Sequence, residues 1–161
     1  MSIRNIVING SNKPTSATSP IEALEEFYFA FNHQDLETMN HNWLQSPKAS
    51  MSNPLGGIKR GWNEIQAVYA RIFTGTARVY VEYYDIEIMQ TDAMFCAVGH
   101  ERGWFRKDDE EIELAIRTSR IYQIENNRWC QLHHHGSIDD PVLLARYQMA
   151  VMPKPGQRTN S

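Results

Sequence analysis

Residues 111–125 read EIELAIRTSRIYQIE, and residues 128–137 read RWCQLHHHGS. Apolar and polar side chains alternate along the first stretch, which predicts a half-buried β-strand. The Asn126-Asn127 pair predicts a tight turn between antiparallel strands, because asparagine tolerates a positive φ. One face of the first strand changes from aliphatic to polar in the order Ile112, Leu114, Ile116, Thr118, Arg120 and Tyr122. This change predicts a hydrophobic core at one end of the strand and a pocket at the other.

The composition is typical of one globular domain with its own core, in a chain of 161 residues. A net charge of −3 and the lack of a basic stripe argue against a nucleic-acid partner. Cys96 and Cys130 belong to no C-x-x-C pair, so we expect buried thiols in a reducing compartment, with a disulfide as the alternative. The sequence has neither a signal-peptide pattern nor an apolar run of about 20 residues. We therefore expect a cytoplasmic protein with no membrane partner.

Helices are expected early in the chain and strands later. Ser19-Pro20 is a typical helix start, because serine caps the helix and proline suits its first position. Asp35 and Asp140 predict the starts of two further helices. The expected helices run from 20 to a break at 32, over 36–44, 62–73 and 142–149; the expected strands cover 77–89, 93–106, 111–125 and 128–137. Residues 49–52 are the candidate for an additional short strand.

Three segments follow from this pattern. Residues 1–19 are expected to form a flexible arm, residues 20–138 the folded domain, and residues 139–161 a helix and a tail that frays from Pro153. Consecutive strands after separate helices are typical of the α+β class. We expect a cone-shaped fold, in which a curved antiparallel sheet wraps around three N-terminal helices and a short helix ends the chain.

Two further motifs give the chain a resemblance to a known superfamily. Residues 27–39 read FYFAFNHQDLETM, an aromatic helix, a polar break and an aspartate-led second helix, and residues 54–61 read PLGGIKRG before the third helix. Both are similar to the nuclear transport factor 2-like superfamily, the fold of ketosteroid isomerase and of SnoaL-type polyketide cyclases. The resemblance covers about residues 20–138.

The last hairpin most closely resembles the association (hub) domain of calcium/calmodulin-dependent kinase II. That family reads TRVWH, a turn, KWQ and HFHRSG, where this chain reads SRIYQ at 119–123, RWC at 128–130 and HHHGS at 133–137. The resemblance implies that Arg120 lines an anion-binding pocket. Gly136 occupies the place of the family's second pocket arginine, and no motif matches the catalytic aspartate of ketosteroid isomerase. No kinase signature is present.

The run His133-His134-His135 raises the question of a metal site. Successive side chains of a strand point to opposite faces, so His133 and His135 share one face and His134 points to the other. A zinc site would need at least one more ligand, for which His100 is the candidate. Structural or interface histidines are the alternative that we favour, and we expect no metal and no cofactor.

Strand parity suggests a more specific site. If the face of the second long strand (93–106) that carries His100 looks inward, then His100, Arg120 and His134 meet at the mouth of a polar pocket. A histidine titrates near neutral pH and could act as an acid or base, while an arginine could hold a carboxylate or enolate oxygen. The other expected ligand-binding residues are Thr118, Tyr122, Trp43, Trp104 and Arg102. The alternative is a hydrogen-bonded polar core, with the aromatic side chains as ordinary core residues.

Two functions remain open at this point. The first is a small-molecule-binding protein. Its catalytic version would be an enzyme of the isomerase, cyclase or dehydratase kind, with His100 or His134 as the base and Arg120 holding a small carbonyl or carboxylic acid. The second is a noncatalytic, hub-like assembly module. A homodimer or a higher homo-oligomer is expected for either function, with the outer sheet face that carries His133 and His135 as the contact surface.

Overall fold

The structure, a computed structural model, describes residues 1–152 and has the expected α+β architecture. The elements follow in the order α1 (Pro20–Asn32), α2 (Leu36–Asn42), β1 (Ser50–Ser52), β2 (Lys59–Arg60), α3 (Trp62–Thr74), β3 (Arg78–Gln90), β4 (Met94–Lys107), β5 (Glu110–Glu125), β6 (Arg128–Ser137) and α4 (Pro141–Val151). The tail expected from Pro153 lies outside the described residues. Within residues 1–152, no helix combines the length and apolarity needed to cross a membrane.

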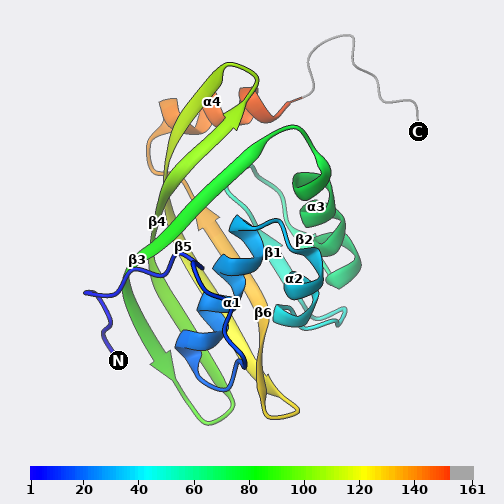
Figure 1. Cartoon of the computed structure of the whole chain (residues 1–161), viewed down its shortest axis with the longest axis vertical. Helices are drawn as coiled ribbons and strands as arrows, with labels where there is room; N and C mark the ends of the chain where they lie inside the picture. Colours follow the sequence, from blue (N-terminus) through cyan, green and yellow to red (C-terminus); the bar gives the residue numbers. More distant parts are fainter. Residues whose placement is uncertain (153–161) are drawn as a thin grey trace.

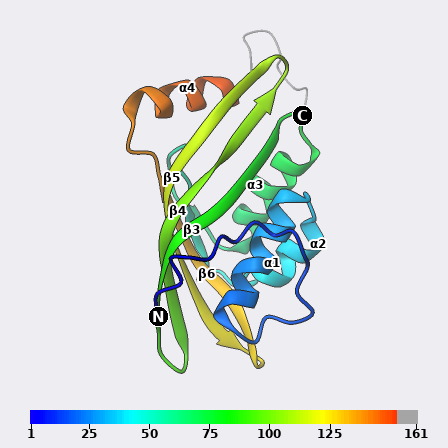
Figure 2. The ribbon, with the colours of Figure 1, turned by 60° about the vertical axis from the view of Figure 1, so that its left-hand side comes forward.

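All strands belong to one curved sheet in the order β2-β1-β6-β5-β4-β3. Neighbouring strands are antiparallel except for β1 and β6, which are parallel. The helices α1, α2 and α3 cover one face of the sheet, and α4 lies near the tip of the β4–β5 hairpin (Figure 1). A second view shows how the long strands bend past these helices (Figure 2). The interior therefore lies between the sheet and the first three helices.

Helix starts follow the local signals in the sequence. Ser19 and Glu22 form a capping box, in which each side chain accepts a hydrogen bond from the backbone of the other residue. The side chain of Asp35 caps α2, and that of Asp140 caps α4. The Asn126-Asn127 turn has φ values of 50° and 60°, as a tight hairpin turn requires. These contacts fix where each element begins.

The bend of the sheet depends on small residues and bulges. A Cβ on Gly103 would lie only 1.9 Å from the backbone oxygen of Tyr80, so β3 and β4 can approach each other only because Gly103 has no side chain. Register shifts interrupt β3 against β4 at Tyr84/Glu87 and β5 against β6 at Ile121/Tyr122. Bulges of this kind increase local twist, which allows the sheet to curl around α1.

The N-terminal arm differs from the expectation of a flexible segment. Ile8 and Tyr83 exchange two backbone hydrogen bonds of 2.8 Å, and the backbone nitrogen of Ile3 donates to the oxygen of Ile86. The side chains of Ile3 and Ile8 are buried. The arm therefore follows the outer edge of β3, because two isoleucines gain hydrophobic burial there.

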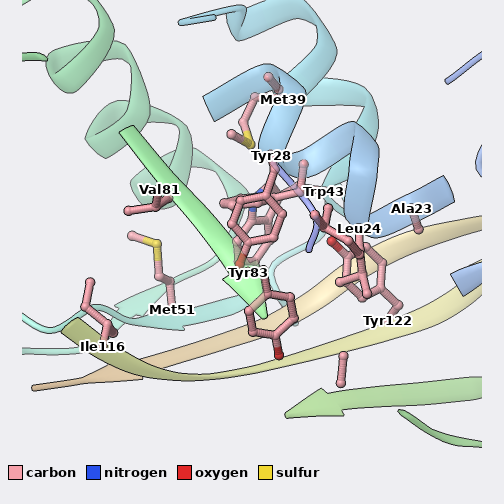
Figure 3. Packing of buried hydrophobic residues seen from close by; sticks show 14 of the residues in the cluster. Ala23, Leu24, Tyr28, Met39, Trp43, Met51, Val81, Tyr83, Ile116 and Tyr122 are labelled. Atoms are coloured by element: carbon pink, nitrogen blue, oxygen red, sulfur yellow. The ribbon is translucent and has the colours of Figure 1, made fainter. Parts of the chain in front are cut away.

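Aromatic side chains fill much of the space between α1 and the sheet (Figure 3). The rings of Tyr28 and Tyr83 stack at 5.4 Å between centroids, and those of Phe95 and Tyr122 stack at 4.6 Å. Buried tyrosines require hydrogen-bond partners for their hydroxyl groups. This aromatic core therefore contains a polar network, which forms the wall of the candidate site.

Candidate functional site

Arg120 is the central polar residue of the interior. It projects from β5 toward the helices and is only 2% exposed. On this strand the inward face is aliphatic from Ile112 to Ile116 and polar from Thr118 to Tyr122. Arg120 lies opposite Ala97 of β4 and His134 of β6 in the sheet register. The inward parity of β5 therefore agrees with the sequence pattern.

Three hydrogen bonds and one ring hold the Arg120 guanidinium. Nη2 donates to Oε1 of Glu101 at 2.9 Å, Nη1 donates to Oε1 of Gln131 at 2.8 Å, and Nε donates to the hydroxyl of Tyr28 at 3.2 Å. The guanidinium carbon also lies 3.5 Å from the centroid of the Phe27 ring. These partners come from α1, β4 and β6, so the side chain has a fixed position.

Glu101 makes this site an ion pair and not an isolated cation. It is 5% exposed, and its Oε1 also accepts a hydrogen bond of 2.5 Å from the Tyr28 hydroxyl. Burial alone would lower the pKa of Arg120, but Tyr28 and Glu101 raise it above its ordinary value, so the guanidinium stays charged. Burial raises the pKa of Tyr28 well above its ordinary value, against the opposing charge of Arg120, so this phenol stays neutral.

His134 lies beside this pair on β6 and faces inward, with 7% of its surface exposed. Burial, and then the charge of Arg120, hold its pKa well below the ordinary value of 6.5, so the ring is neutral at neutral pH. Its Nδ1 atom is buried and has no hydrogen-bond partner within residues 1–152. An unpaired buried polar atom costs free energy and calls for a partner; a ligand would supply one.

A cavity of about 90 Å³ adjoins these residues. Its polar wall contains Glu101, Arg120 and His134, and much of the remaining wall consists of aliphatic and aromatic side chains from α1, α3, β3 and β5. The Pro54 ring closes one side, where it would lie 3.2 Å from a Cβ on Gly136. Pro54 therefore takes the space beside Gly136, and Arg120 is the one arginine among residues 1–152 that lines this cavity.

Three further predicted site residues lie behind the cavity wall. The Tyr122 hydroxyl donates to Oδ1 of Asn42 at 3.1 Å. Trp43 stacks on Trp62 at 6.3 Å, and Thr118 is buried on β5. All three belong to the buried core around the site, and none of them lines the cavity itself. The hydroxyl of Thr118 and Nε1 of Trp43 lack hydrogen-bond partners among residues 1–152.

The expected inward orientation of His100, Arg102 and Trp104 is wrong. On β4 it is Glu101 that pairs with Ile116 and faces the interior, so the residues on either side of it point to the outer face. There, His100 Nδ1 lies 3.4 Å from Asp85. A shift of one residue reverses the facing of a whole strand. The apolar residues that share the parity of Glu101 could have revealed this: Phe95, Ala97 and Phe105.

Arg102 and Trp104 instead belong to an aromatic and charged cluster on that outer face. Arg102 Nε donates to Oε1 of Glu82 at 2.5 Å, and its guanidinium carbon lies 4.4 Å from the Tyr84 ring centroid. Trp104 stacks on Tyr80 at 5.9 Å. These residues form no part of the inner cavity.

The histidine run alternates as the strand pattern predicts. His133 and His135 lie opposite Ile121 and Ser119 on the outer face of the sheet, and Nδ1 of His133 lies 2.7 Å from the Ser50 hydroxyl oxygen. Within residues 1–152, no group of three or more potential metal-ligating side chains comes together. The structure thus separates His134 from its two neighbours.

Comparison with known proteins assigns the class. The SnoaL-like domain family matches residues 21–141, about three quarters of the sequence, and the chain belongs to this family. Its fold is that of the nuclear transport factor 2-like superfamily. No curated protein matches the chain.

Solved structures of the same fold are similar at low sequence identity. A proposed calcium/calmodulin-dependent protein kinase type II association domain from Thiobacillus denitrificans has a TM-score of 0.67 and 20% identity, over 79% of this chain and all of that one. A proposed dehydratase of the nuclear transport factor 2-like family from Streptomyces avermitilis has a TM-score of 0.63 and 20% identity, over 71% of this chain and 89% of that one. A protein with a cystatin-like fold from Caulobacter vibrioides has a TM-score of 0.60 and 19% identity, over 81% of this chain and 94% of that one. These similarities establish the fold alone.

Proposed function

We propose that this protein binds a small, partly apolar molecule in the cavity beside Arg120. The observation that carries the proposal is His134, whose neutral, buried ring lines the cavity and has an unpaired Nδ1. A mostly apolar hollow with a few converging polar groups is the usual form of a small-molecule site. The orphan nitrogen gains its missing hydrogen bond when such a ligand binds.

The charges of the site favour a neutral oxygen group on the ligand at this depth. Glu101 already balances the charge of Arg120, and the two side chains are 2.9 Å apart. A carboxylate beside them would bring a second negative charge close to Glu101 without an added cation. A carbonyl or hydroxyl group avoids this repulsion, and it can still hydrogen-bond to His134 or to a free N–H of Arg120. We therefore place a ketone, aldehyde or alcohol function here, and not the carboxylate.

Ligand binding can be tested with one pair of variants on the same strand. His134→Leu removes the inward imidazole, whereas His135→Leu removes an exposed one on the opposite face. A ligand that binds only the folded state raises the melting temperature. We expect small ketones and alcohols to raise the melting temperature of the wild type and of His135→Leu. They should not raise the melting temperature of His134→Leu. The proposal is wrong if no compound binds, or if hits bind both variants equally.

The same geometry is suited to proton transfer. A neutral histidine next to a fixed arginine can accept a proton from a carbon adjacent to a carbonyl, while the arginine stabilises the developing oxyanion. His134 and Arg120 are partners in the sheet register and line the same cavity, so one ligand can contact both. Deuterium exchange at that carbon, followed by NMR, is the test. Exchange that His134→Leu abolishes supports an enzyme of the isomerase, cyclase or dehydratase kind, whereas binding without exchange supports a binding protein.

A second candidate function is assembly. The outer face of β3 and β4 carries the Tyr80–Trp104 stack, and the guanidinium carbon of Arg106 lies 3.8 Å from the Trp104 ring centroid. Aromatic residues and arginine are enriched at protein interfaces, and one of the similar folds is a proposed association domain. We propose that the chain forms a homodimer through this outer face. Light scattering tests this: a monomer contradicts it, and a large ring favours the hub-like function.

A further inference from the structure

A second hollow adjoins the inner cavity on the side of α4. It has a volume of about 240 Å³. The two hollows share five wall residues, namely Phe31, Leu55, Ile72, Val79 and Tyr147. The two hollows therefore lie next to each other, with these residues as a common wall. Because they share this wall, one elongated molecule could occupy both after small side-chain rotations.

The outer hollow has an unbalanced positive charge at its rim. Arg71 at the end of α3 and Lys107 at the end of β4 both line it, and much of the remaining wall is apolar. Neither cation forms an ion pair with any side chain of residues 1–152. Lys107 also lines a separate hollow together with the acidic residues 108–110, whereas no acidic residue among residues 1–152 lines the outer hollow itself. The rim thus differs from the deep end, where Glu101 neutralises Arg120.

The sizes of the hollows also favour one continuous site. The inner cavity, at about 90 Å³, is smaller than the cavity of about 150 Å³ that holds benzene in a well-studied protein. Pockets for small molecules usually measure about 300–1,000 Å³. The inner cavity alone falls below this range, whereas the two hollows together reach its lower end.

We propose that the two hollows form one channel for an amphipathic carboxylic acid. Its carboxylate lies at the rim between Arg71 and Lys107, its aliphatic chain passes Phe31 and Tyr147, and a hydroxyl or keto oxygen reaches His134. This inference rests on the proposed binding function of the inner cavity. It places the acid group at the uncompensated cations and the neutral oxygen at the compensated ion pair.

The probes are octanol, octanoate and ω-hydroxyoctanoate, and calorimetric titration measures their affinities for the full chain. We expect ω-hydroxyoctanoate to bind most tightly, because it alone satisfies both ends of the channel. Each added methylene should improve affinity by roughly threefold to fourfold until the channel is full. Raising the salt concentration should lower the affinity of both acids, because salt screens exposed charges. The affinity of octanol should not change.

The decisive variant is the double substitution Arg71→Gln and Lys107→Gln. Both residues are at the surface, so the fold should be unaffected. Loss of each exposed ion pair should weaken acid binding by up to about fivefold, with no change for octanol. Lys59→Gln, an exposed cation of β2 far along the sheet order, is the matched control and should change nothing.

The outcomes separate the channel from the function on which it rests. If octanol binds through His134 but the acids bind no better, or if the double variant binds the acids unchanged, the channel inference is wrong and the inner binding site stands. If none of the three probes binds to the wild type, both the channel and the inner site are contradicted. If the double variant loses affinity for the acids alone, the channel is supported.

Discussion

Arg120 and Glu101 form an ion pair of 2.9 Å in the interior of the sheet, and their side chains are only 2% and 6% exposed. The Tyr28 hydroxyl bridges the two, since it accepts from Nε of Arg120 and donates to Oε1 of Glu101. Removing two charges from water costs several kcal/mol each, so such a pair is stable only when all its hydrogen bonds are made. The pair and its network therefore respond strongly to single substitutions.

Breaking the pair on one side should be costly. Glu101→Leu leaves the guanidinium buried without its counter-charge, and we expect a loss of about 3–5 kcal/mol in the free energy of unfolding. The double variant Glu101→Leu with Arg120→Met should be more stable than Glu101→Leu alone, because no unpaired charge remains. Urea unfolding of both variants measures this. A double variant that is less stable than the single one would contradict the argument.

The stability of the protein should depend on pH through His134. Burial and the charge of Arg120 hold its pKa well below 6.5 in the folded state. Below about pH 6.5 the unfolded chain binds a proton that the folded chain does not, so the free energy of unfolding falls as the pH is lowered. One such group gives a slope of up to about 1.4 kcal/mol per pH unit.

The contribution of His134 is isolated by comparison with His134→Leu between about pH 7.5 and 5.5. His133 also has a lowered pKa, mainly from burial, and its effect has the same sign. The contribution of His133 should remain in His134→Leu. The free energy of unfolding of this variant should therefore depend less steeply on pH than that of the wild type. Equal slopes would show that folding does not lower the pKa of His134. At neutral pH, His134→Leu should cost little stability, because it removes an unpaired polar atom.

The N-terminal arm provides a matched pair of substitutions. Ile8 is 2% exposed and Val7 is 45% exposed, although they are neighbours in the sequence. Ile8→Ala should lower the free energy of unfolding by about 2–5 kcal/mol, whereas Val7→Ala should change it by less than about 0.5 kcal/mol. Thermal or urea unfolding measures both. Equal effects would mean that the arm is not packed on β3 in solution.

Gly103 should tolerate no side chain. Its Cβ would lie 1.9 Å from the backbone oxygen of Tyr80, which cannot move without separating β3 from β4. We expect Gly103→Ala to destabilise the protein by at least about 3 kcal/mol. Gly57→Ala is the control: it has open space around it and a φ of 76°, so its cost should be about 1 kcal/mol. Hydrogen exchange of the β3 and β4 amides would show whether the loss is local.

Most of the fold could be predicted from short-range signals. The Ser19 cap, the Asp35 cap and the Asn126-Asn127 turn each act within a few residues, so the sequence shows them directly. The parallel pairing of β1 with β6 could not be read in this way. Ser50 and His133 are far apart in the chain, and three-residue β1 has no clear pattern of its own.

The site was only partly predictable, for a related reason. Arg120 and His134 face inward, and the regular alternation of β5 together with the resemblance pointed to both. Glu101 and Gln131, the partners of Arg120, were missed because the facing of β4 depends on its register and that of β6 on a bulge. A charged residue on an inward face also looks like a solvent-exposed one in the sequence. Long-range pairing therefore decides which polar residues meet.

Neither edge of the sheet is free to pair with a strand of another molecule. At one edge, β2 is only two residues long, and both of its residues, Lys59 and Arg60, are exposed and charged. At the other edge, the N-terminal arm forms hydrogen bonds with the backbone of β3. The side-chain amide of Asn32 also forms hydrogen bonds with both the backbone nitrogen and the backbone oxygen of Val81. Free edges are the usual starting point for amyloid-like stacking. The native molecule should therefore resist fibril growth, and any ordered polymer would have to form after the arm had detached.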